Sequence, residues 1–274
     1  EVDNSMSLYN PQSLLSRLNR NETDSVDGFI AECIRTARRI SEQSDGAYDI
    51  TVKPLTAAYG FTGDVPVQNP DVDSLLKLVG YDKIAVENGR LRKADPRMQI
   101  DLNSIAQGAT SDYIAAYFEK LGIEEYMIEV GGEIFCRGLN AKGKPWVVGI
   151  DRPKEGNFTP GADLQVKISL SGKGLATSGN YRKFRTDSSG RKIVHTVDPR
   201  TGQPVTSDLL SATVVAETSA EADAYGTALM VMGLERGKEF LAAHPEIQAY
   251  LIYSDEQGRF QTYVTPELGR TIAR

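Results

Sequence analysis

Asp223 and Thr227 form a pair of residues whose types and spacing could do chemistry. They lie four positions apart in Glu221–Leu229, a segment typical of a helix, and residues four apart share one helix face. A carboxylate and a hydroxyl on one face can both offer oxygens to a hard cation such as Mg²⁺. Gly226 lies between them and leaves the backbone open to a ligand. The spacing alone favours a plainer interpretation, an exposed aspartate near a helix start with the threonine turned inward.

A second candidate is Ile100–Gly108, where a predicted strand ends in small polar residues and a helix follows. The unpaired amides of a helix start suit an anion such as a diphosphate. Asp101 could bind a hydroxyl or ring N–H of the same ligand. Simple capping of the helix by Asn103 or Ser104 explains the same residues, and it is the favoured interpretation of this segment alone.

His195 precedes a turn sequence, Asp198–Gly202, in which Pro199 fixes φ and Gly202 takes the position that is awkward for other residues. Because histidine titrates near neutral pH, His195 could act as a general base. A half-buried structural histidine fits the local sequence about as well.

Two glycine-containing segments are weaker candidates. Gly174–Arg182 is a loop of small residues that could let the backbone approach a flat ligand, or it is simply a turn between strands. Gly131 and Gly132 follow a predicted strand and indicate a bulge or a close backbone contact. Glu129 and Glu133 beside them could be catalytic carboxylates, but solvated or capping carboxylates are the favoured interpretation.

The composition excludes several classes of protein. Of 274 residues, 40% are hydrophobic and 25% charged, which is ordinary for a globular protein and excludes collagen, a long coiled coil and wholesale disorder. Lys and Arg number 31 and Asp and Glu 37, a net charge of −6, so general nucleic-acid binding is not expected. The apolar surroundings of Cys33 and Cys136 favour buried thiols over a disulfide, and neither His195 nor His244 has a nearby Cys or His that would complete a zinc site.

The elements that must position these residues are short strands with hairpin-like spacing and a few helices. Helices are expected near 25–45, 72–79, 104–121, 220–232 and 234–243, and strands near 47–52, 84–86, 90–92, 98–102, 126–130, 133–137, 145–150, 164–170, 181–186, 193–197, 209–216, 249–253 and 260–264. In the helix 104–121, the residues expected to face inward are Ile105, Tyr113, Ala116, Tyr117 and Leu121. The pattern predicts an α+β fold with a largely antiparallel mixed sheet and packed helices, in one domain over 1–274.

The order of the motifs is more specific than any one of them. The chain contains, in sequence, Ser7-Leu-Tyr9, Gly46-Ala-Tyr-Asp-Ile-Thr-Val-x-Pro-Leu55, Asp101-Leu-x-x-Ile-Ala-x-Gly108, Val130-Gly-Gly, Thr177-Ser-Gly-x-Tyr-Arg182, His195-x-x-Asp-Pro-x-Thr-Gly-x-Pro204 and Ala222-Asp-Ala-x-x-Thr-Ala-Leu229. Together these motifs resemble the ApbE family of FAD:protein FMN transferases over nearly the whole chain. The resemblance implies an ApbE-like, T-fold-like single domain.

The resemblance also implies an activity. The family cleaves FAD at its diphosphate with Mg²⁺, transfers FMN to a threonine hydroxyl of a target flavoprotein such as a redox-pump subunit, and releases AMP. Phosphoryl transfer needs positioning and charge neutralisation more than covalent help, and an acidic protein that binds a diphosphate needs a cation. Two alternatives stay open: an FAD pyrophosphatase that gives FMN and AMP, and a non-catalytic FAD-binding protein.

Carried over motif by motif, the resemblance implies three sets of site residues. The FAD contacts would be Tyr9, Ala47, Tyr48, Asp49, Asp101, Gln107 and Val197. The metal site would be Ser104, through its carbonyl, with Asp223, Gly226 and Thr227. The catalytic residues would be His195 as base and Asp223, with Asp198 orienting the histidine or shaping the turn.

The chain departs from the family pattern in a few places. The family usually opens with a strand and a helix before Ser7-Leu-Tyr9, and we expect both to be absent here. Ala109 stands where a tyrosine is common, Gly226 where many relatives have Asp, and Lys53 where a small residue is frequent. The resemblance suggests a bacterial exported protein facing the periplasm or the outer surface, lipid-anchored before processing, and it leaves the oligomeric state unknown.

Overall fold

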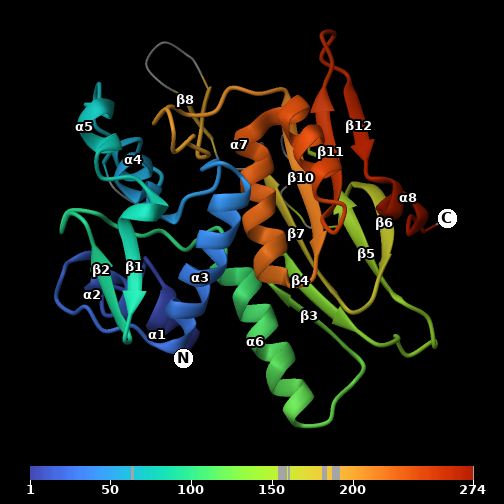
Figure 1. The fold of residues 1–274 in the computed structure, drawn as a ribbon. Coiled ribbons are helices and arrows are strands. Elements are labelled where there is room, and N and C mark those ends of the chain that lie inside the picture. The colour runs from blue at the N-terminus through green and yellow to red at the C-terminus, as the bar shows by residue number, and fades with distance from the viewer. Residues whose placement is uncertain (63–64, 154–158, 160, 181–183, 187–191, 274) are drawn as a thin grey trace. The chain divides into compact units, whose positions relative to one another are not determined.

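The structure is a computed structural model that describes residues 1–62, 65–153, 159, 161–180, 184–186 and 192–273, with the backbone only at 184–186 and 192–193. The chain forms two compact units, and Figure 1 labels their elements. The first unit is Glu1–Ala106 with Arg185–Val205, and the second is Gln107–Phe184 with Thr206–Arg274. Each is described by itself.

The first unit is built from helices and small two-stranded sheets. Its elements are α1 (Val2–Met6), α2 (Leu14–Asn19), α3 (Gly28–Gln43), α4 (Lys53–Ala58), α5 (Val72–Leu76), the 3₁₀ helices Ile50–Val52 and Tyr81–Lys83, β1 (Ile84–Glu87) and β2 (Arg90–Lys93). Strands β8 (Phe184–Thr186) and β9 (Lys192–Val194) form a further two-stranded sheet at the boundary of the units.

Local sequence explains the longest helix and the first hairpin of this unit. The Asp27 side chain accepts a hydrogen bond of 3.0 Å from the Ile30 amide and caps α3, whose apolar stripe is buried. The helix ends at Gln43, and Asp45 and Gly46 shortly after it both have positive φ, in agreement with the left-handed helix end that the sequence predicts. Strands β1 and β2 pair antiparallel around the predicted Asn-Gly turn.

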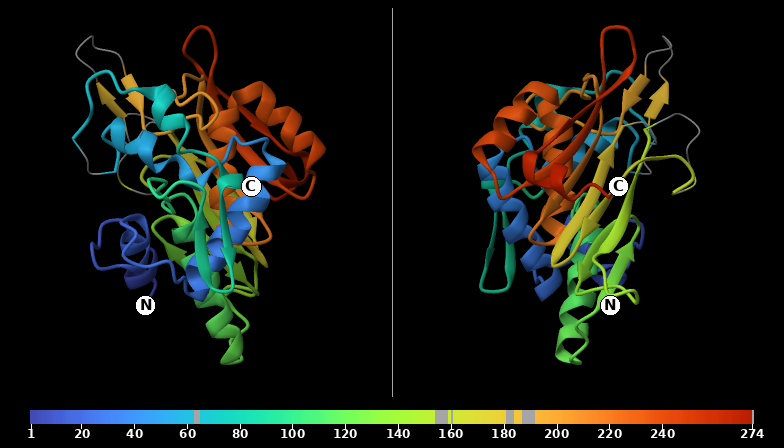
Figure 2. Two further views of the ribbon diagram at one scale, coloured as in Figure 1. Left: turned by 60° about the vertical axis from the view of Figure 1, so that its left-hand side comes forward. Right: turned by 90° about the vertical axis from the view of Figure 1, so that its right-hand side faces the viewer.

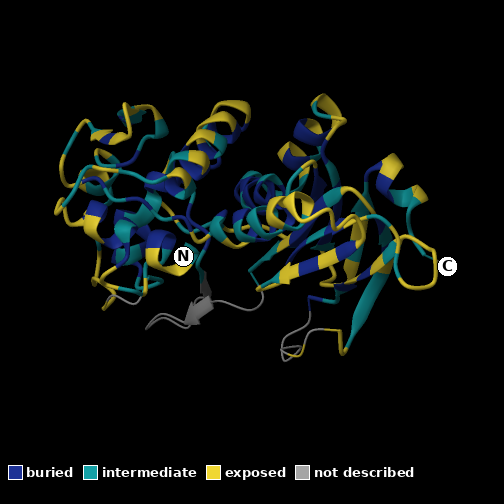
Figure 3. Cartoon of the chain, turned by 90° about the horizontal axis from the view of Figure 1, so that it is seen from below, coloured by how far each residue is buried: buried dark blue, intermediate teal, exposed yellow. Residues whose placement is uncertain are grey.

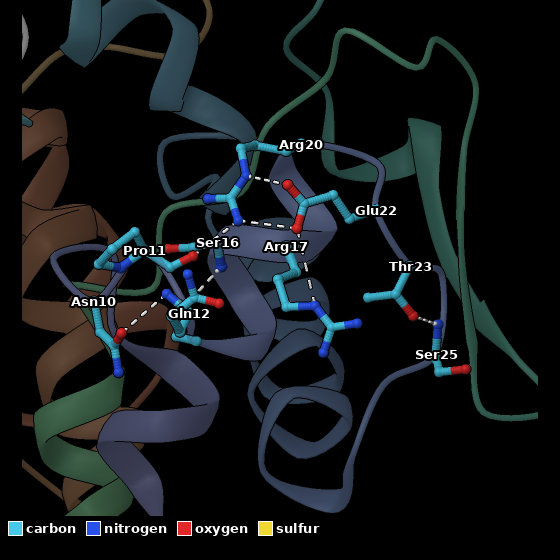
Figure 4. A network of polar contacts seen from close by, with 10 residues as sticks. Asn10, Pro11, Gln12, Ser16, Arg17, Arg20, Glu22, Thr23 and Ser25 are labelled. Carbon is cyan, nitrogen blue, oxygen red and sulfur yellow. Dashed lines mark hydrogen bonds and ion pairs between the residues drawn. The ribbon is translucent and has the colours of Figure 1, made fainter.

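A surface network ties the loop before α2 to the chain that follows it (Figure 4). The Arg20 guanidinium donates to both carboxylate oxygens of Glu22, at 2.6 and 3.0 Å, and to the Pro11 carbonyl at 2.8 Å. The Nε of Arg17 also lies 3.9 Å from the Oε2 of Glu22. Because these side chains are largely exposed, the network contributes little to stability.

Two predicted strands of this unit are wrong. Residues 50–58 form a 3₁₀ turn and α4, because Asp49 caps the turn and Pro54 fits the first turn of a helix. Residues 98–102 belong to none of the strands in the described parts of the chain. Their backbone is held by the side chain of Asn19, which accepts from the Ile100 amide at 2.7 Å and donates to its carbonyl at 2.8 Å.

The second unit is a six-stranded sheet with helices and a hairpin packed on it. Its elements are α6 (Ala106–Lys120), β3 (Tyr126–Val130), β4 (Glu133–Arg137), β5 (Trp146–Asp151), β6 (Leu164–Leu170), β7 (Lys173–Gly179), β10 (Leu209–Ala216), α7 (Ser219–Ala243), β11 (Gln248–Ser254), β12 (Phe260–Val264) and α8 (Pro266–Arg270). The strand order is β12-β11-β10-β7-β4-β3, and each of these pairs is antiparallel. The α+β, largely antiparallel prediction is confirmed.

The two faces of this sheet carry different partners. On one face, residues of the sheet such as Leu175 and Val215 form a buried core with the β5–β6 hairpin. Neighbouring β7 residues point the other way, and there Gly174 and Ser178 meet α7. The right-hand view of Figure 2 shows the hairpin and α7 on opposite sides of the sheet. In Figure 3 the helices carry exposed residues along one side, as expected for helices packed on a sheet.

The helices of the second unit match the sequence less closely. Ala116 is exposed, as are Tyr117 (59%) and Leu121 just after α6 (57%), so their predicted inward orientation is wrong. Ile105, just before α6, is buried as predicted. The buried positions of α6 are small, among them Gly108, Ser111 and Ala115, because this helix approaches its neighbours closely. The two helices predicted for 220–243 form α7, with a break at Gly233, where φ is 74°. None of the helices in the described ranges is long and apolar enough to cross a membrane.

Candidate functional site

In the second unit, Asp223 lies in the second turn of α7 and is buried. Thr218 caps the helix by accepting from the Glu221 amide at 3.1 Å, and the Glu221 side chain accepts from the Thr218 amide in return. Asp223 is only 6% exposed, so its interpretation as an exposed aspartate near a helix start is wrong. The Gly108 amide of α6 donates to its Oδ2 at 3.5 Å.

The surroundings of Asp223 disfavour its negative charge. Burial raises its pKa well above the ordinary value, the nearby carboxylate of Glu133 raises it further, and the Gly108 hydrogen bond opposes both. Glu133 is itself 8% exposed, so its interpretation as a solvated carboxylate is wrong. A cation beside Asp223 would remove this electrostatic cost.

Thr227 follows Asp223 by one helical turn, as the spacing predicts. Its hydroxyl lies 3.4 Å from the hydroxyl of Ser178 in β7. Gly226 packs directly on the same serine, because a Cβ at this position would lie 2.9 Å from the Ser178 Oγ. In the parts of the chain that the structure describes, no group of three or more His, Cys, Asp or Glu side chains could hold a metal ion. A cation at Asp223 would therefore also need hydroxyl, carbonyl, phosphate or water oxygens.

Gln107 also lies in this unit, at the start of α6. Its side chain is against Gly131, since a Cβ on that glycine would overlap the Gln107 amide nitrogen. Of the Gly131-Gly132 pair, Gly131 therefore makes a close contact, whereas a Cβ on Gly132 would meet nothing within 4 Å.

In the first unit, the segments 47–49 and 101–104 come together. The Asp101 amide donates to the Ile50 carbonyl at 2.7 Å. The hydroxyls of Tyr48 and Ser104 are 3.2 Å apart, and the Tyr48 hydroxyl is 3.4 Å from the Ser104 carbonyl. Two motifs that are separate in the sequence therefore form one cluster.

Asp49 is the buried carboxylate of this cluster. It is 6% exposed and accepts two hydrogen bonds of 2.7 Å from the amide and hydroxyl of Thr51. Burial raises its pKa above the ordinary value, and the Thr51 bonds oppose the shift. Asp101 instead accepts from the Asn103 amide at 2.8 Å, a local turn that lies before the first residue of α6.

The turn after His195 belongs to the same unit. Arg200 donates to both carboxylate oxygens of Asp198 at 2.8 Å, which fixes the turn. The turn packs against the end of α4, where the hydroxyl of Tyr59, the residue just after the helix, donates to the Gly202 carbonyl at 2.9 Å. The ring of His195 lies edge-on to Phe61, with centroids 6.4 Å apart.

The remaining predicted residues lie in different surroundings. Val197 is buried in the core of α4 and α5, and Ala47 is also buried, whereas Tyr9 is 68% exposed. Lys53, whose role the sequence leaves open, donates to the Gln99 side chain at 3.1 Å. The motif residues Tyr181 and Arg182 lie outside the described residues.

Sequence reasoning missed two residues that hold these clusters in place. Asn19 binds Ile100 in the first unit, and Asp112 binds the first turn of α7 in the second. The only local signal for Asp112 is its place four residues after Gly108, on the same face of α6. Nothing local to Asn19 points to a partner 81 residues away.

Comparison with known proteins shows sequence similarity to one family. A sequence model described as "ApbE family" matches residues 1–251. The FAD:protein FMN transferase of Escherichia coli K12 is 34% identical over 276 residues, covering 97% of this chain and 77% of its own. That of Klebsiella pneumoniae is 35% identical over 250 residues, covering 88% and 69%.

Solved structures agree with the sequence comparisons. The flavin transferase ApbE from Vibrio cholerae superposes with a TM-score of 0.85 at 32% identity, over 98% of this chain and 86% of its own. The ApbE protein from Thermotoga maritima gives 0.84 at 27% identity, over 100% and 88%.

Proposed function

The chain belongs to the ApbE family, and we infer that it is an enzyme that transfers FMN from FAD to a target protein. The family model spans residues of both units, which supports assigning 1–274 to one flavin transferase domain. The structural observation that carries the assignment is the cluster in the first unit, where the Ile50–Asp101 bond joins two of the family's motifs.

The reaction that we propose is a phosphoryl transfer to a threonine hydroxyl. The hydroxyl oxygen attacks the phosphorus on the FMN side of the FAD diphosphate, a new P–O bond forms, and the bond to AMP breaks. The hydroxyl proton passes to a base, and AMP leaves with the bridging oxygen. Catalysis of this kind depends on placing the diphosphate and neutralising its charge.

The first unit would supply most of the FAD contacts. Tyr48, Asp49 and Asp101 are held in one cluster, and their hydroxyl and carboxylates suit the hydroxyl and N–H groups of a dinucleotide. The remaining proposed contacts are Ala47 and Val197 in buried positions, Tyr9 with an exposed ring, and Gln107 of the second unit. Stacking of a flavin or adenine ring on Tyr9 would use that exposed aromatic face.

A divalent cation, Mg²⁺ in our proposal, fits the residues of the second unit. Asp223 is a buried carboxylate beside Glu133, and hydroxyl oxygens of Thr227 and Ser178 lie close together one turn on. Such hard oxygen donors are those that Mg²⁺ prefers. We propose Asp223, Gly226 and Thr227 as the residues that hold it, with Ser104 kept in the set on the resemblance alone. When bound, the cation would neutralise charge on the diphosphate.

His195 is the proposed base. Histidine is the side chain best suited to general base catalysis near neutral pH, and the Asp198–Arg200 pair fixes the turn that begins just after His195. Its task would be to accept the threonine proton as the oxygen attacks.

The target and the compartment are proposals from the resemblance. We propose a flavoprotein subunit of a redox pump or a similar protein as the acceptor, and a bacterial exported enzyme on the periplasmic or outer-surface side, lipid-anchored before processing. Fractionation of the producing cells, with detection of the enzyme in each fraction, tests the second point.

One assay tests the proposed reaction. The protein is incubated with FAD, MgCl₂ and an acceptor domain that a characterised family member flavinylates, and the products are read by mass spectrometry and chromatography. We expect the acceptor to gain one FMN less water, with one AMP released per adduct, and no adduct on an acceptor whose target threonine is alanine. Free FMN and AMP without adduct would indicate a pyrophosphatase, and intact FAD would indicate a binding protein.

A further inference from the structure

The first turn of α7 is held by a carboxylate from another helix. Asp112 of α6 accepts hydrogen bonds from the Ser219 amide at 2.8 Å and from the Ala220 amide at 2.9 Å. These amides lie in the first helical turn, where N–H groups have no partner within the helix. Because Thr218 and Glu221 already form a capping box there, Asp112 is a second cap from a distant part of the chain.

The helices are also in close contact at this point. A Cβ on Gly108 would overlap the carbonyl of Ser219, and a Cβ on Gly174 of β7 would overlap its amide. Gly108, one turn before Asp112 in α6, also donates its amide to Asp223. One face of α6 therefore contacts both the start of α7 and the carboxylate in its second turn.

The surroundings of Asp112 disfavour its negative charge. Burial raises the pKa of Asp112 to about 6, so its ionised form is costly at neutral pH. Its charge also acts unfavourably on Asp223. The geometry nevertheless favours a carboxylate, because its two oxygens, fixed on two adjacent amides, define where the helix begins.

We propose that Asp112 is a positioning residue for FMN transfer. By fixing Ser219 and Ala220 on α6, it holds the carboxylate of Asp223 beside the Gly108 amide, in the place from which Asp223 binds the cation. This inference rests on the proposed metal role of Asp223. It assigns to Asp112 no contact with FAD or with the cation.

The test compares Asp112→Ala and Asp112→Asn with a matched control, Thr218→Ala, which removes the helix's own cap. Two constants are measured for each protein: the dissociation constant for MnCl₂ in the absence of FAD, by electron paramagnetic resonance, and the MgCl₂ concentration for half-maximal FMN transfer. Asp112→Ala should raise both by about tenfold or more, the usual range for a residue that orients a metal ligand. Asp112→Asn keeps one acceptor oxygen and should lie between it and the wild type.

Thr218→Ala should lower the melting temperature as Asp112→Ala does but leave both constants unchanged. The proposal would be overturned if Asp112→Ala had the same Mn²⁺ dissociation constant and the same half-maximal MgCl₂ concentration as the wild type. It would also be overturned if Thr218→Ala raised both constants as much as Asp112→Ala does. If Asp112→Ala shows no cooperative melting, Asp112→Asn replaces it. The proposal then requires that Asp112→Asn raises both constants and that Thr218→Ala does not. A wild type that binds no Mn²⁺ and transfers FMN without Mg²⁺ would refute the metal role of Asp223, and with it this inference, before any variant is made.

Discussion

The main-chain amide of Asp101 donates a hydrogen bond of 2.7 Å to the carbonyl of Ile50. This bond joins the segment that follows α3 to the segment that precedes α6, and it places Asp49 and Asp101 near each other. Ile100 precedes Asp101, and its main-chain amide and carbonyl both hydrogen-bond to the buried side chain of Asn19. The proposed FAD contacts of the first unit therefore depend on a side chain that is distant in the sequence.

Replacing Asn19 tests this dependence. Asn19→Ala leaves the buried amide and carbonyl of Ile100 without their partner, which should cost about 2–4 kcal/mol of the free energy of unfolding. We also expect weaker FAD binding, because Asp101 is no longer held. Urea unfolding and quenching of flavin fluorescence measure the two effects. The half-buried Asn10, whose side chain accepts from the Gln12 amide at 2.9 Å (Figure 4), is the control, and Asn10→Ala should change neither quantity appreciably.

Asp223→Asn should abolish metal-dependent transfer without weakening the fold. The amide oxygen can still accept from Gly108, and the change removes a buried charge next to Glu133, so the melting temperature should stay the same or rise. Transfer should fall by roughly 10²-fold or more, because a metal ligand is lost. A variant that transfers FMN at the normal rate at saturating MgCl₂ would contradict the metal assignment.

His195→Ala should reduce transfer far more than FAD binding. Loss of a general base costs roughly 10²–10⁴-fold in rate. The dissociation constant for FAD, measured by fluorescence, should change little, since the Asp198–Arg200 pair still fixes the turn. His244, which packs on Phe240 with ring centroids 4.4 Å apart, provides the matched His→Ala control with normal transfer. Equal losses of binding and rate in His195→Ala would make His195 a ligand contact instead.

The parts of the fold that the sequence predicted are those determined by neighbouring residues. The Asn88-Gly89 turn needs only its own two residues to fix the β1–β2 hairpin, and α3 carries its apolar stripe within its own length. Residues 98–102 have a strand-like pattern, but the group that satisfies their backbone is the side chain of Asn19, and no local pattern reveals it.

The candidate site shows the same limit. The spacing of Asp223 and Thr227 predicted a shared face of α7, but the burial of Asp223 depends on α6 and β4 packing against that face. Asp112 could not be identified, because its two partners lie 107 and 108 residues along the chain. Tyr117 was misplaced because close packing of α6 selects small residues, which weakens its apolar period.

The raised pKa of Asp112 predicts a change of stability with pH. Its pKa is about 6 in the folded protein against 3.8 as the reference, so the folded state holds this proton more tightly. As pH rises from about 4 to about 6, the unfolded chain loses the proton first, and the free energy of unfolding falls by at most about 3 kcal/mol. Asp112→Asn lacks this titration, so the wild type should lose stability relative to the variant over that range. Urea unfolding of both proteins at about pH 4 and about pH 7 checks the sign, and a difference that is constant with pH would contradict it.

The contact between Gly226 and Ser178 predicts coupling between two substitutions. A Cβ at Gly226 would lie 2.9 Å from the Ser178 Oγ and 3.4 Å from its Cβ, so Gly226→Ala forces the helix and β7 apart. This cost should outweigh the gain of about 1 kcal/mol that alanine brings to a helix interior, and Gly226→Ala should lower the free energy of unfolding. In a Ser178→Ala background the hydroxyl is gone, the nearest contact is the 3.4 Å one, and the same substitution should be neutral or stabilising. Urea unfolding of the four proteins gives the coupling energy, which we expect to be at least about 1 kcal/mol. The same cost of Gly226→Ala in both backgrounds would show that α7 does not rest on this serine.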